Sequence, residues 1–351
     1  MEDPFSCFSS DSDDCSRDEF IGHEHEQGKR LKEAANIKLQ ITSKAGSTDY
    51  TPIESSGYEI YSCSNQDGYI TGQFGIRAKR KYETGDLIMS ESPAMRINTA
   101  FVASTREEAV EKYENKLQDV FDNLSPLTAQ SIMDLSSCKE TDEVKTPMGI
   151  FQTNSFSLEQ NTGYGGLFIT VARMNHSCNP NVNHHWRPDV HRMNCYAARD
   201  IAINEELCTN YGPTNLTNFS STSERREYLE KKYAFRCACE MCMCGNDYGG
   251  DDRMLEIRDL LENISCFTNE PHKLKGDVDK CLQLMKQQGI KNGKNVATVL
   301  HHGYLASMMS QENDMARSYL QKELKCVEAC QGKTSYRALD LRRMLDNMSP
   351  Y

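Results

Sequence analysis

The sequence predicts an α+β protein with several small β-sheets, a helical insertion, a cysteine-rich segment and an all-helical C-terminal domain. Three observations support this fold class. Short segments of strand character, separated by turn residues, occupy residues 58–91 and 149–207. Apolar residues recur at three- and four-residue intervals in residues 104–137 and throughout 253–348, which is the period of a helix. Between the strand-rich and the last helical region, four cysteines fall within residues 237–244.

Length, charge and cysteine content restrict the classes of function. The 351 residues suffice for one large domain and a smaller one, and a hydrophobic content of 38% allows a packed core. The net charge of −11 argues against direct binding to nucleic acid and suits lysine-rich protein partners. No apolar run reaches the 18 residues of a membrane span. Fifteen cysteines without a secretory pattern indicate an intracellular protein of the nucleus or cytoplasm, in which cysteines are metal ligands or core residues.

The N-terminal part divides into a tail and a strand-rich region. Residues 1–50 are acidic and serine-rich, which predicts a disordered tail. A short strand is expected at residues 58–61, and further segments follow at 72–78 and at 82–91, with Thr84-Gly85-Asp86 as a turn between strands.

Helical periodicity then predicts an insertion over about residues 104–147. Pro126 after Ser125 suits the first position of its second helix. Extended structure is expected again at residues 149–156, which include Asn154, and a strand pair at 191–198 and 199–207. Farther on, Ser221 and Glu224 form a capping box that starts a helix ending near Tyr233.

The central feature is Asn175-His176-Ser177-Cys178, which places an amide, an imidazole, a hydroxyl and a thiol side by side. The apolar residues 167–171 precede it and a turn-forming Asn-Pro-Asn follows it, so a strand is expected to end there in a site. Two later stretches carry similar chemistry. They are residues 205–212, which end in Tyr211 and glycine, and residues 235–242, which begin with Phe235.

Three cysteines of the last stretch have the spacing of metal ligands. Cys237, Cys239 and Cys242 supply three thiolates, whereas tetrahedral zinc takes four ligands. Cys244 is the local candidate for the fourth ligand, although its two-residue step from Cys242 is tight. A cysteine elsewhere in the chain is the alternative.

The C-terminal part shows five apolar stripes of helical period, separated by turn residues. The stripes are typical of stacked helix pairs of the tetratricopeptide type, although no 34-residue repeat is evident. We interpret them as core positions. Residues 245–252 are glycine- and aspartate-rich and predict a flexible hinge before these helices.

In their order and separations, the three stretches resemble the signature of SET-domain protein lysine methyltransferases. The resemblance covers about residues 58–244 and is closest to fungal-type SET proteins and the related SET-and-MYND group. In that group a cysteine-rich zinc module interrupts the SET region. The helical insertion of this chain holds only Cys138, so we expect no such module. The implied domains are a SET domain at 51–217, a zinc-binding post-SET segment at 218–250 and a helical domain at 251–351.

The resemblance assigns roles to individual residues. Tyr211 matches the active-site tyrosine, and Tyr233 matches a residue that lines the channel for the substrate lysine. Zinc is expected on the post-SET cysteines and the cysteine of the central motif: Cys178, Cys237, Cys239 and Cys242. S-adenosylmethionine is expected at the positions that match the cofactor site: Gly75, Asn154, Asn175, His176, Tyr211 and Phe235. One departure is that Gln73 replaces the first glycine of a Gly-x-Gly turn, with Gly72 one place earlier. Either the turn has an extra residue or this cofactor contact differs.

The implied activity is methyl transfer from S-adenosylmethionine to a lysine side chain of a histone or another protein. A free lysine has a pKa of about 10.4, so forming the neutral amine at pH 7 costs about 4.6 kcal/mol, and the site must remove water from it. Two alternatives remain open. The chain could be a SET-fold binding protein with little catalysis, or a helical-repeat scaffold with a structural zinc site and a protein partner on its C-terminal helices.

Overall fold

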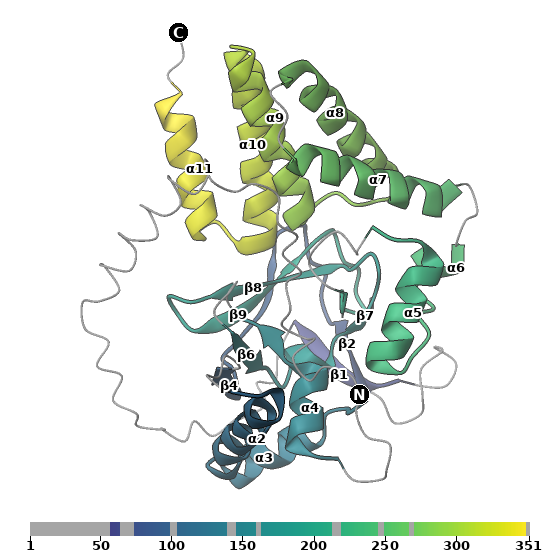
Figure 1. Cartoon of the computed structure of the whole chain (residues 1–351), viewed down its shortest axis with the longest axis vertical. Coiled ribbons are helices and arrows are strands. Elements are labelled where there is room, and N and C mark those ends of the chain that lie inside the picture. The colour runs from purple at the N-terminus through teal and green to yellow at the C-terminus, as the bar shows by residue number, and fades with distance from the viewer. Residues whose placement is uncertain are drawn as a thin grey trace.

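The computed structural model describes residues 57–63, 74–98, 104–138, 145–158, 163–212, 219–244, 249–266 and 270–348. The expected tail, Gly72 and Gln73 lie outside these residues. Small β-sheets occupy the middle of the molecule, with the helices of the insertion at one end and the C-terminal helices at the other (Figure 1). The expected α+β class, with its helical insertion and helical C-terminal region, is confirmed.

Among the described residues, four small sheets form the central layer. Two of them are pairs: β1 (Tyr58–Ser62) with β2 (Phe74–Ala78), antiparallel, and β7 (Asn175–His176) with β10 (Cys208–Thr209), parallel. A three-stranded sheet has the order β3 (Leu87–Glu91), β9 (Arg192–Ala197), β8 (Val182–Arg187). The other has the order β4 (Met95–Asn98), β6 (Tyr164–Leu167), β5 (Phe156–Ser157).

The expected strand pair at 191–198 and 199–207 is half right. The first strand is β9, but its partners are β3 and β8 rather than the residues that follow it. Residues 199–207 make two single bridges instead, from Ile201 to Tyr82 and from Glu206 to Arg77. The strand β8 was missed because His184 and His185 interrupt its apolar residues, so its pattern is not a clean alternation.

The helical insertion forms as predicted but extends further along the chain. Its helices are α2 (Arg106–Asp122) and α3 (Pro126–Met133), the latter capped by Ser125. The extended segment predicted at 149–156 is wrong, because α4 (Pro147–Asn154) covers most of it. The Thr146 side chain accepts the Gly149 N–H at 3.1 Å, and proline stands in the first turn, a start signal that outweighs the β-propensity of the residues after it.

The predicted capping box is confirmed at α5 (Thr222–Tyr233). The Ser221 side chain accepts the Glu224 N–H, and the Glu224 carboxylate accepts the Ser221 N–H. The helix ends as expected at Tyr233, and Ala234 turns the chain in the left-handed region with φ of 57°. The chain thereby leads from α5 into the cysteines and the short α6 (Glu240–Cys244).

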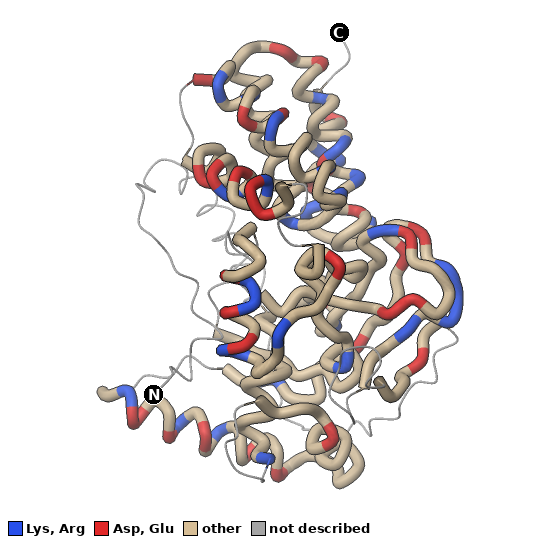
Figure 2. The backbone as a smooth tube through the Cα atoms, turned by 90° about the vertical axis from the view of Figure 1, so that its right-hand side faces the viewer, with Lys and Arg blue, Asp and Glu red and all other residues tan. Residues whose placement is uncertain are grey.

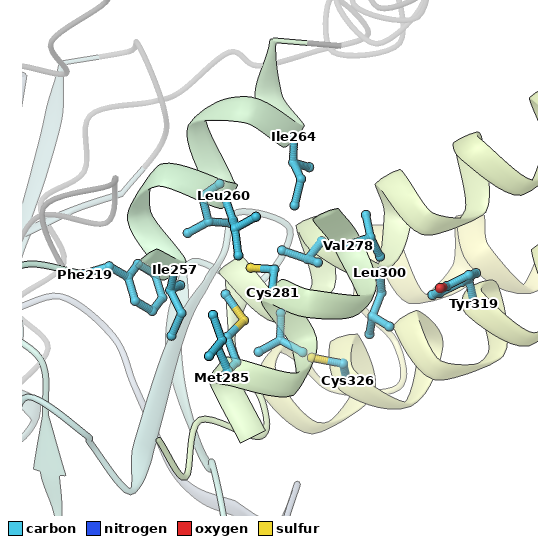
Figure 3. Close-up of a cluster of buried hydrophobic side chains, with 14 of the residues drawn as sticks. Phe219, Ile257, Leu260, Ile264, Val278, Cys281, Met285, Leu300, Tyr319 and Cys326 are labelled. Atoms are coloured by element: carbon cyan, nitrogen blue, oxygen red, sulfur yellow. The ribbon is translucent and has the colours of Figure 1, made fainter. Parts of the chain in front are cut away.

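Five helices form the C-terminal region, one for each predicted stripe. They are α7 (Gly250–Ser265), α8 (Pro271–Gln287), α9 (Lys294–Met309), α10 (Asn313–Gln331) and α11 (Tyr336–Asn347). The stripe residues form the core between the helices, and Phe219 from the segment before α5 joins it beside Ile257 (Figure 3).

The expected hinge at 245–252 is wrong in its last three residues, which form the first turn of α7. Acidic side chains there suit the positive end of the helix dipole.

The C-terminal helices contact the three-stranded sheet of β3, β9 and β8. The Asn183 amide of β8 donates to the Cys330 sulfur of α10 at 3.2 Å, and the Arg187 guanidinium donates to the Thr334 hydroxyl at 3.0 Å. These contacts hold the helical region against the strands that follow the central motif.

Charge is spread over the molecule. On the side shown in Figure 2, lysine and arginine are interspersed with aspartate and glutamate along the helices and loops. Within the described part of the chain, no helix combines the length and the apolar character that a membrane crossing requires.

Two helical glycines of the C-terminal region provide a matched test of the packing. A Cβ at Gly303 would lie 2.6 Å from the ring of Tyr319, whose hydroxyl is held by Asp279, whereas a Cβ at Gly276 would meet nothing within 4 Å. Both alanine substitutions gain about 1 kcal/mol of helix propensity. We expect Gly276→Ala to stabilise the protein by about that amount and Gly303→Ala to destabilise it, because overpacking costs about 1–3 kcal/mol. Urea unfolding measures both, and equal gains in the two variants would contradict this packing.

Candidate active site and metal centre

The short parallel pair β7–β10 brings two of the three motif stretches together. Asn175 lies opposite Cys208 and His176 opposite Thr209, and the Ser177 N–H donates to the Thr209 carbonyl at 2.9 Å. The chain between them forms β8 and β9, which supply the crossover that a parallel pair requires. This pairing places Tyr211 beside the central motif.

His176 lies between Tyr211 and Cys178. Its Nδ1 accepts the Tyr211 main-chain N–H at 3.0 Å, and its Nε2 lies 3.3 Å from the Cys178 sulfur. Burial lowers the pKa of His176 to about 4, so the ring is neutral at pH 7. Since Nδ1 accepts a hydrogen bond, the proton of the neutral ring is on Nε2, which donates toward Cys178. One imidazole therefore connects the tyrosine segment to the cysteine.

The Tyr211 side chain is held by the residue before the central motif. Its hydroxyl donates to the Met174 carbonyl at 2.7 Å. Burial raises the pKa of Tyr211, so the phenol remains protonated at neutral pH. Tyr233 donates its own hydroxyl to the Tyr211 carbonyl at 3.2 Å, which fixes the end of α5 against this segment.

Four aromatic rings from three separate stretches meet at this point. The centroid of Tyr211 lies 5.4 Å from His176, 5.1 Å from Tyr233 and 6.2 Å from Phe235. The Tyr211 and Phe235 rings are nearly perpendicular, at 85°, and His176 lies 6.0 Å from Phe235. The cluster forms an apolar wall around the Tyr211 hydroxyl and the main chain of the motif.

Gly75 and Asn175 lie close together on the β1–β2 side. A Cβ at Gly75 would be 3.0 Å from the Asn175 amide nitrogen and 2.9 Å from a carboxylate oxygen of Glu206. The Asn175 amide donates to this carboxylate at 2.8 Å. Glu206 belongs to the Glu-Glu-Leu stretch before Tyr211, but no role is predicted for it from the sequence.

The Asn154 amide is held by main-chain carbonyls of the helical insertion. At the C-terminal end of α4, its amide nitrogen donates to the carbonyls of Ser136 at 2.7 Å and Ile150 at 2.8 Å. The residue therefore stands at the end of a helix and not in the extended segment expected at 149–156, and its predicted contact with the cofactor stays a prediction.

Four cysteines converge beside the aromatic cluster. The sulfur atoms of Cys178, Cys237, Cys239 and Cys242 all lie within 4.8 Å of one another. Cys178 lies 3.9 Å from Cys237 and 3.5 Å from Cys242. Four sulfurs at the Zn–S length of about 2.3 Å around a tetrahedral ion are about 3.8 Å apart, so the spacing fits one zinc ion.

Of the two candidates for the fourth ligand, Cys178 lies in the cluster and Cys244 does not. Cys244 is exposed at the end of α6.

Three side chains without a sequence-assigned role support the site. The Glu91 carboxylate accepts the N–H groups of Thr170 and Val171, each at 2.9 Å, and so fixes the turn before the central motif. Arg226 donates to the carbonyl oxygens of Cys237 at 3.1 Å and Cys242 at 3.0 Å, and Arg225 faces the sulfur of Cys242. These contacts join residues far apart in the chain, and no local pattern signals them.

Sequence comparisons match the middle of the chain to a known family and to several known proteins. The SET domain family matches residues 73–212. Histone-lysine N-methyltransferase set5 of Schizosaccharomyces pombe is 29% identical over 191 residues, which is 54% of this chain and 52% of the relative. Putative SET domain-containing protein L678 of Acanthamoeba polyphaga mimivirus is 29% identical over 163 residues, 46% of this chain and 58% of the relative. Human histone-lysine N-methyltransferase SMYD3 is 33% identical over 104 residues, 28% of this chain and 23% of the relative.

The first two of these relatives are about twice as long as the region that matches, so the chain spans about half their length. Among solved structures, a chain of apo ctPRC2 in an autoinhibited state aligns with 83% of this chain and 33% of its own length, at 13% identity and a TM-score of 0.25.

Residues 73–212 of the chain therefore match a SET domain. The chain is homologous to fungal SET5 proteins and to SET-and-MYND proteins, which agrees with the resemblance predicted from the three motif stretches.

Replacement of single cysteines tests the composition of the cluster. We expect Cys178→Ser to lower the zinc content of the purified protein, because it removes one of four ligands, while Cys244→Ser leaves the zinc content at one ion per chain. Elemental analysis measures both variants beside the wild type. Zinc kept in Cys178→Ser and lost in Cys244→Ser would mean a local four-cysteine site.

Proposed function

We propose that this protein is an S-adenosylmethionine-dependent protein lysine methyltransferase. The observation that carries the proposal is the convergence of Tyr211, His176 and Asn175 with two further aromatic residues inside a SET domain. The domain division we propose is that of the sequence analysis: a SET domain at 51–217, a zinc segment at 218–250 and a helical domain from 251 onward.

The residues on the β1–β2 side and in the central motif fit the cofactor. Gly75 offers bare backbone beside the Asn175 amide, and Phe235 presents a flat apolar ring near His176. We assign Gly75, Asn175, His176, Tyr211 and Phe235 to the binding of S-adenosylmethionine, which supplies a methyl group on a sulfonium. Asn154 would add to this site only through its carbonyl oxygen, because its amide nitrogen is engaged by two main-chain carbonyls.

The aromatic cluster suits a lysine amine that must react without its proton. Tyr211, Tyr233 and Phe235 exclude water from the region of the Tyr211 hydroxyl, and an apolar environment favours the neutral amine. The raised pKa of Tyr211 keeps its hydroxyl protonated. We therefore assign Tyr211 to orientation of the reacting groups by hydrogen bonding rather than to removal of the lysine proton.

A structural zinc ion would complete this arrangement. Phe235 precedes Cys237 by two residues, and Cys178 follows His176 by two residues. A metal bound to all four cysteines would fix the segment that carries Phe235 against the segment that carries Asn175 and His176.

The relatives suggest the first substrates to test. Two of them carry the name histone-lysine N-methyltransferase, so we propose histone lysines as the substrate class, which would place the protein in the nucleus for at least part of its function. The C-terminal helices are our proposed surface for a protein partner.

The direct test is transfer of the labelled methyl group from S-adenosylmethionine to purified histones and to a cell lysate. We expect label on lysine side chains. If S-adenosylmethionine binds in calorimetry but no label is transferred to any protein, the chain is a SET-fold binding protein. If S-adenosylmethionine does not bind at all, the proposed cofactor site is wrong.

The tyrosine at the centre of the aromatic cluster provides a specific prediction. We expect Tyr211→Phe to lower methyl transfer by about 100-fold or more, because it removes the hydroxyl that orients the reacting groups. Binding of S-adenosylmethionine and the melting temperature should change little. Tyr336→Phe, at an exposed position of α11, is the matched control and should retain full activity. Near-normal turnover in Tyr211→Phe would remove the role assigned to this residue.

A further inference from the structure

Arg225 places a buried positive charge beside the cysteine cluster. Its side chain lies in α5 and is only 7% exposed, and of the lysines and arginines in the described ranges it alone is fully buried. Its Nη2 lies 3.8 Å from the Cys242 sulfur and donates to the Thr222 hydroxyl at 3.0 Å. Its Nη1 donates to the Ser220 carbonyl.

Such a charge stabilises a buried metal centre of four cysteines. Four thiolates and one zinc ion carry a net charge of about −2. A net charge in a buried environment is costly unless an opposite charge or hydrogen-bond donors compensate it. Arg225 supplies a full positive charge at Cys242, and His176 supplies an N–H at Cys178. Arg226, by contrast, directs its donors to main-chain carbonyls of the same segment.

The orientation of the Arg225 guanidinium depends on α7. Asp251, in the first turn of α7, lies 3.8 Å from Nη1 of Arg225. The same carboxylate oxygen accepts the Thr222 N–H at 2.9 Å and the Thr222 hydroxyl at 2.8 Å. Phe219, just before these residues, is inserted in the core of the C-terminal helices beside Ile257 (Figure 3). The first turn of α5 is therefore attached to the helical C-terminal region.

We propose that Arg225 is a positioning residue that retains the metal: its guanidinium, oriented by Asp251 of α7, is the buried counter-charge of the four-cysteine centre. The inference rests on the proposed zinc centre and goes beyond it, because it makes metal retention depend on a contact with the C-terminal helices. Loss of the counter-charge raises the free energy of the zinc-bound state more than that of the metal-free protein, in which thiols can be neutral.

The test measures the rate of zinc release from the zinc-loaded, full-length protein in excess EDTA. Arg225→Gln removes the charge, and Arg225→Lys keeps it. Arg258→Gln is the matched control, because Arg258 also joins α7 to α5, through Glu224 at 3.6 Å, but makes a partly exposed ion pair away from the sulfurs. Far-UV circular dichroism and melting curves report whether each variant is folded.

We expect Arg225→Gln to release zinc about 10- to 100-fold faster than the wild type, the range typical of outer-shell partners of metal ligands. Arg225→Lys should be accelerated less than Arg225→Gln, because the charge is kept although contacts of the guanidinium to Ser220 and Thr222 are lost. Arg258→Gln should not differ from the wild type. A folded Arg225→Gln variant that releases zinc at the wild-type rate overturns the inference. Equal acceleration in Arg225→Gln and Arg225→Lys also overturns it, because packing rather than charge would then be responsible.

If Arg225→Gln does not fold, the zinc release rate of the Asp251→Asn variant tests the inference instead. That variant keeps the arginine and loosens its orientation, so we expect release at least about threefold faster, and an unchanged rate overturns the inference. If the wild-type protein is purified without zinc, both the proposed metal centre and this inference are wrong. If the wild type contains zinc and Arg225→Gln releases it at the wild-type rate, only the inference about Arg225 is wrong.

Discussion

Cys178 lies 3.9 Å from Cys237 and 3.5 Å from Cys242, although 59 and 64 residues separate them along the chain. The arrangement of the candidate site depends on this contact. Closing a loop of this length costs conformational entropy, and metal binding can supply the free energy that offsets it. With the loop closed, Phe235 and the end of α5 lie against the central motif, and the aromatic cluster around Tyr211 is complete.

The two sides of the cysteine cluster have different neighbours, and each leads to a different part of the molecule. On one side, His176 connects the sulfur of Cys178 to the main chain of Tyr211, so the position of the tyrosine is coupled to the cluster. On the other side, Arg225 connects the sulfur of Cys242 to Asp251 and so to the C-terminal helices. The candidate active site, the cysteine cluster and the helical region are thus joined by one series of hydrogen bonds and ion contacts.

Local signals in the sequence predicted local structure well. The capping box at Ser221, the stripes of the C-terminal helices and the strands around the Thr84-Gly85-Asp86 turn all follow from neighbouring residues, and the structure agrees with them. The helix α4 was not predicted, because the apolar residues with β-propensity suggested a strand and the start signal at Thr146 was given too little weight. The roles of Glu91 and Arg225 could not be predicted, because each depends on main-chain or sulfur atoms supplied by a distant segment. The motif spacing singled out His176, Tyr211 and the four clustered cysteines, which the structure brings together, but not these supporting contacts.

X-ray absorption at the zinc edge of the wild-type protein tests the central claim, that one metal ion joins the central motif to the segment after α5. The account predicts one zinc ion per chain with four sulfur neighbours at about 2.3 Å. Three sulfurs and one nitrogen or oxygen neighbour would contradict it, because Cys178 would then be free and the motif would not be bound to the segment through the metal. Protein purified without zinc would contradict it as well.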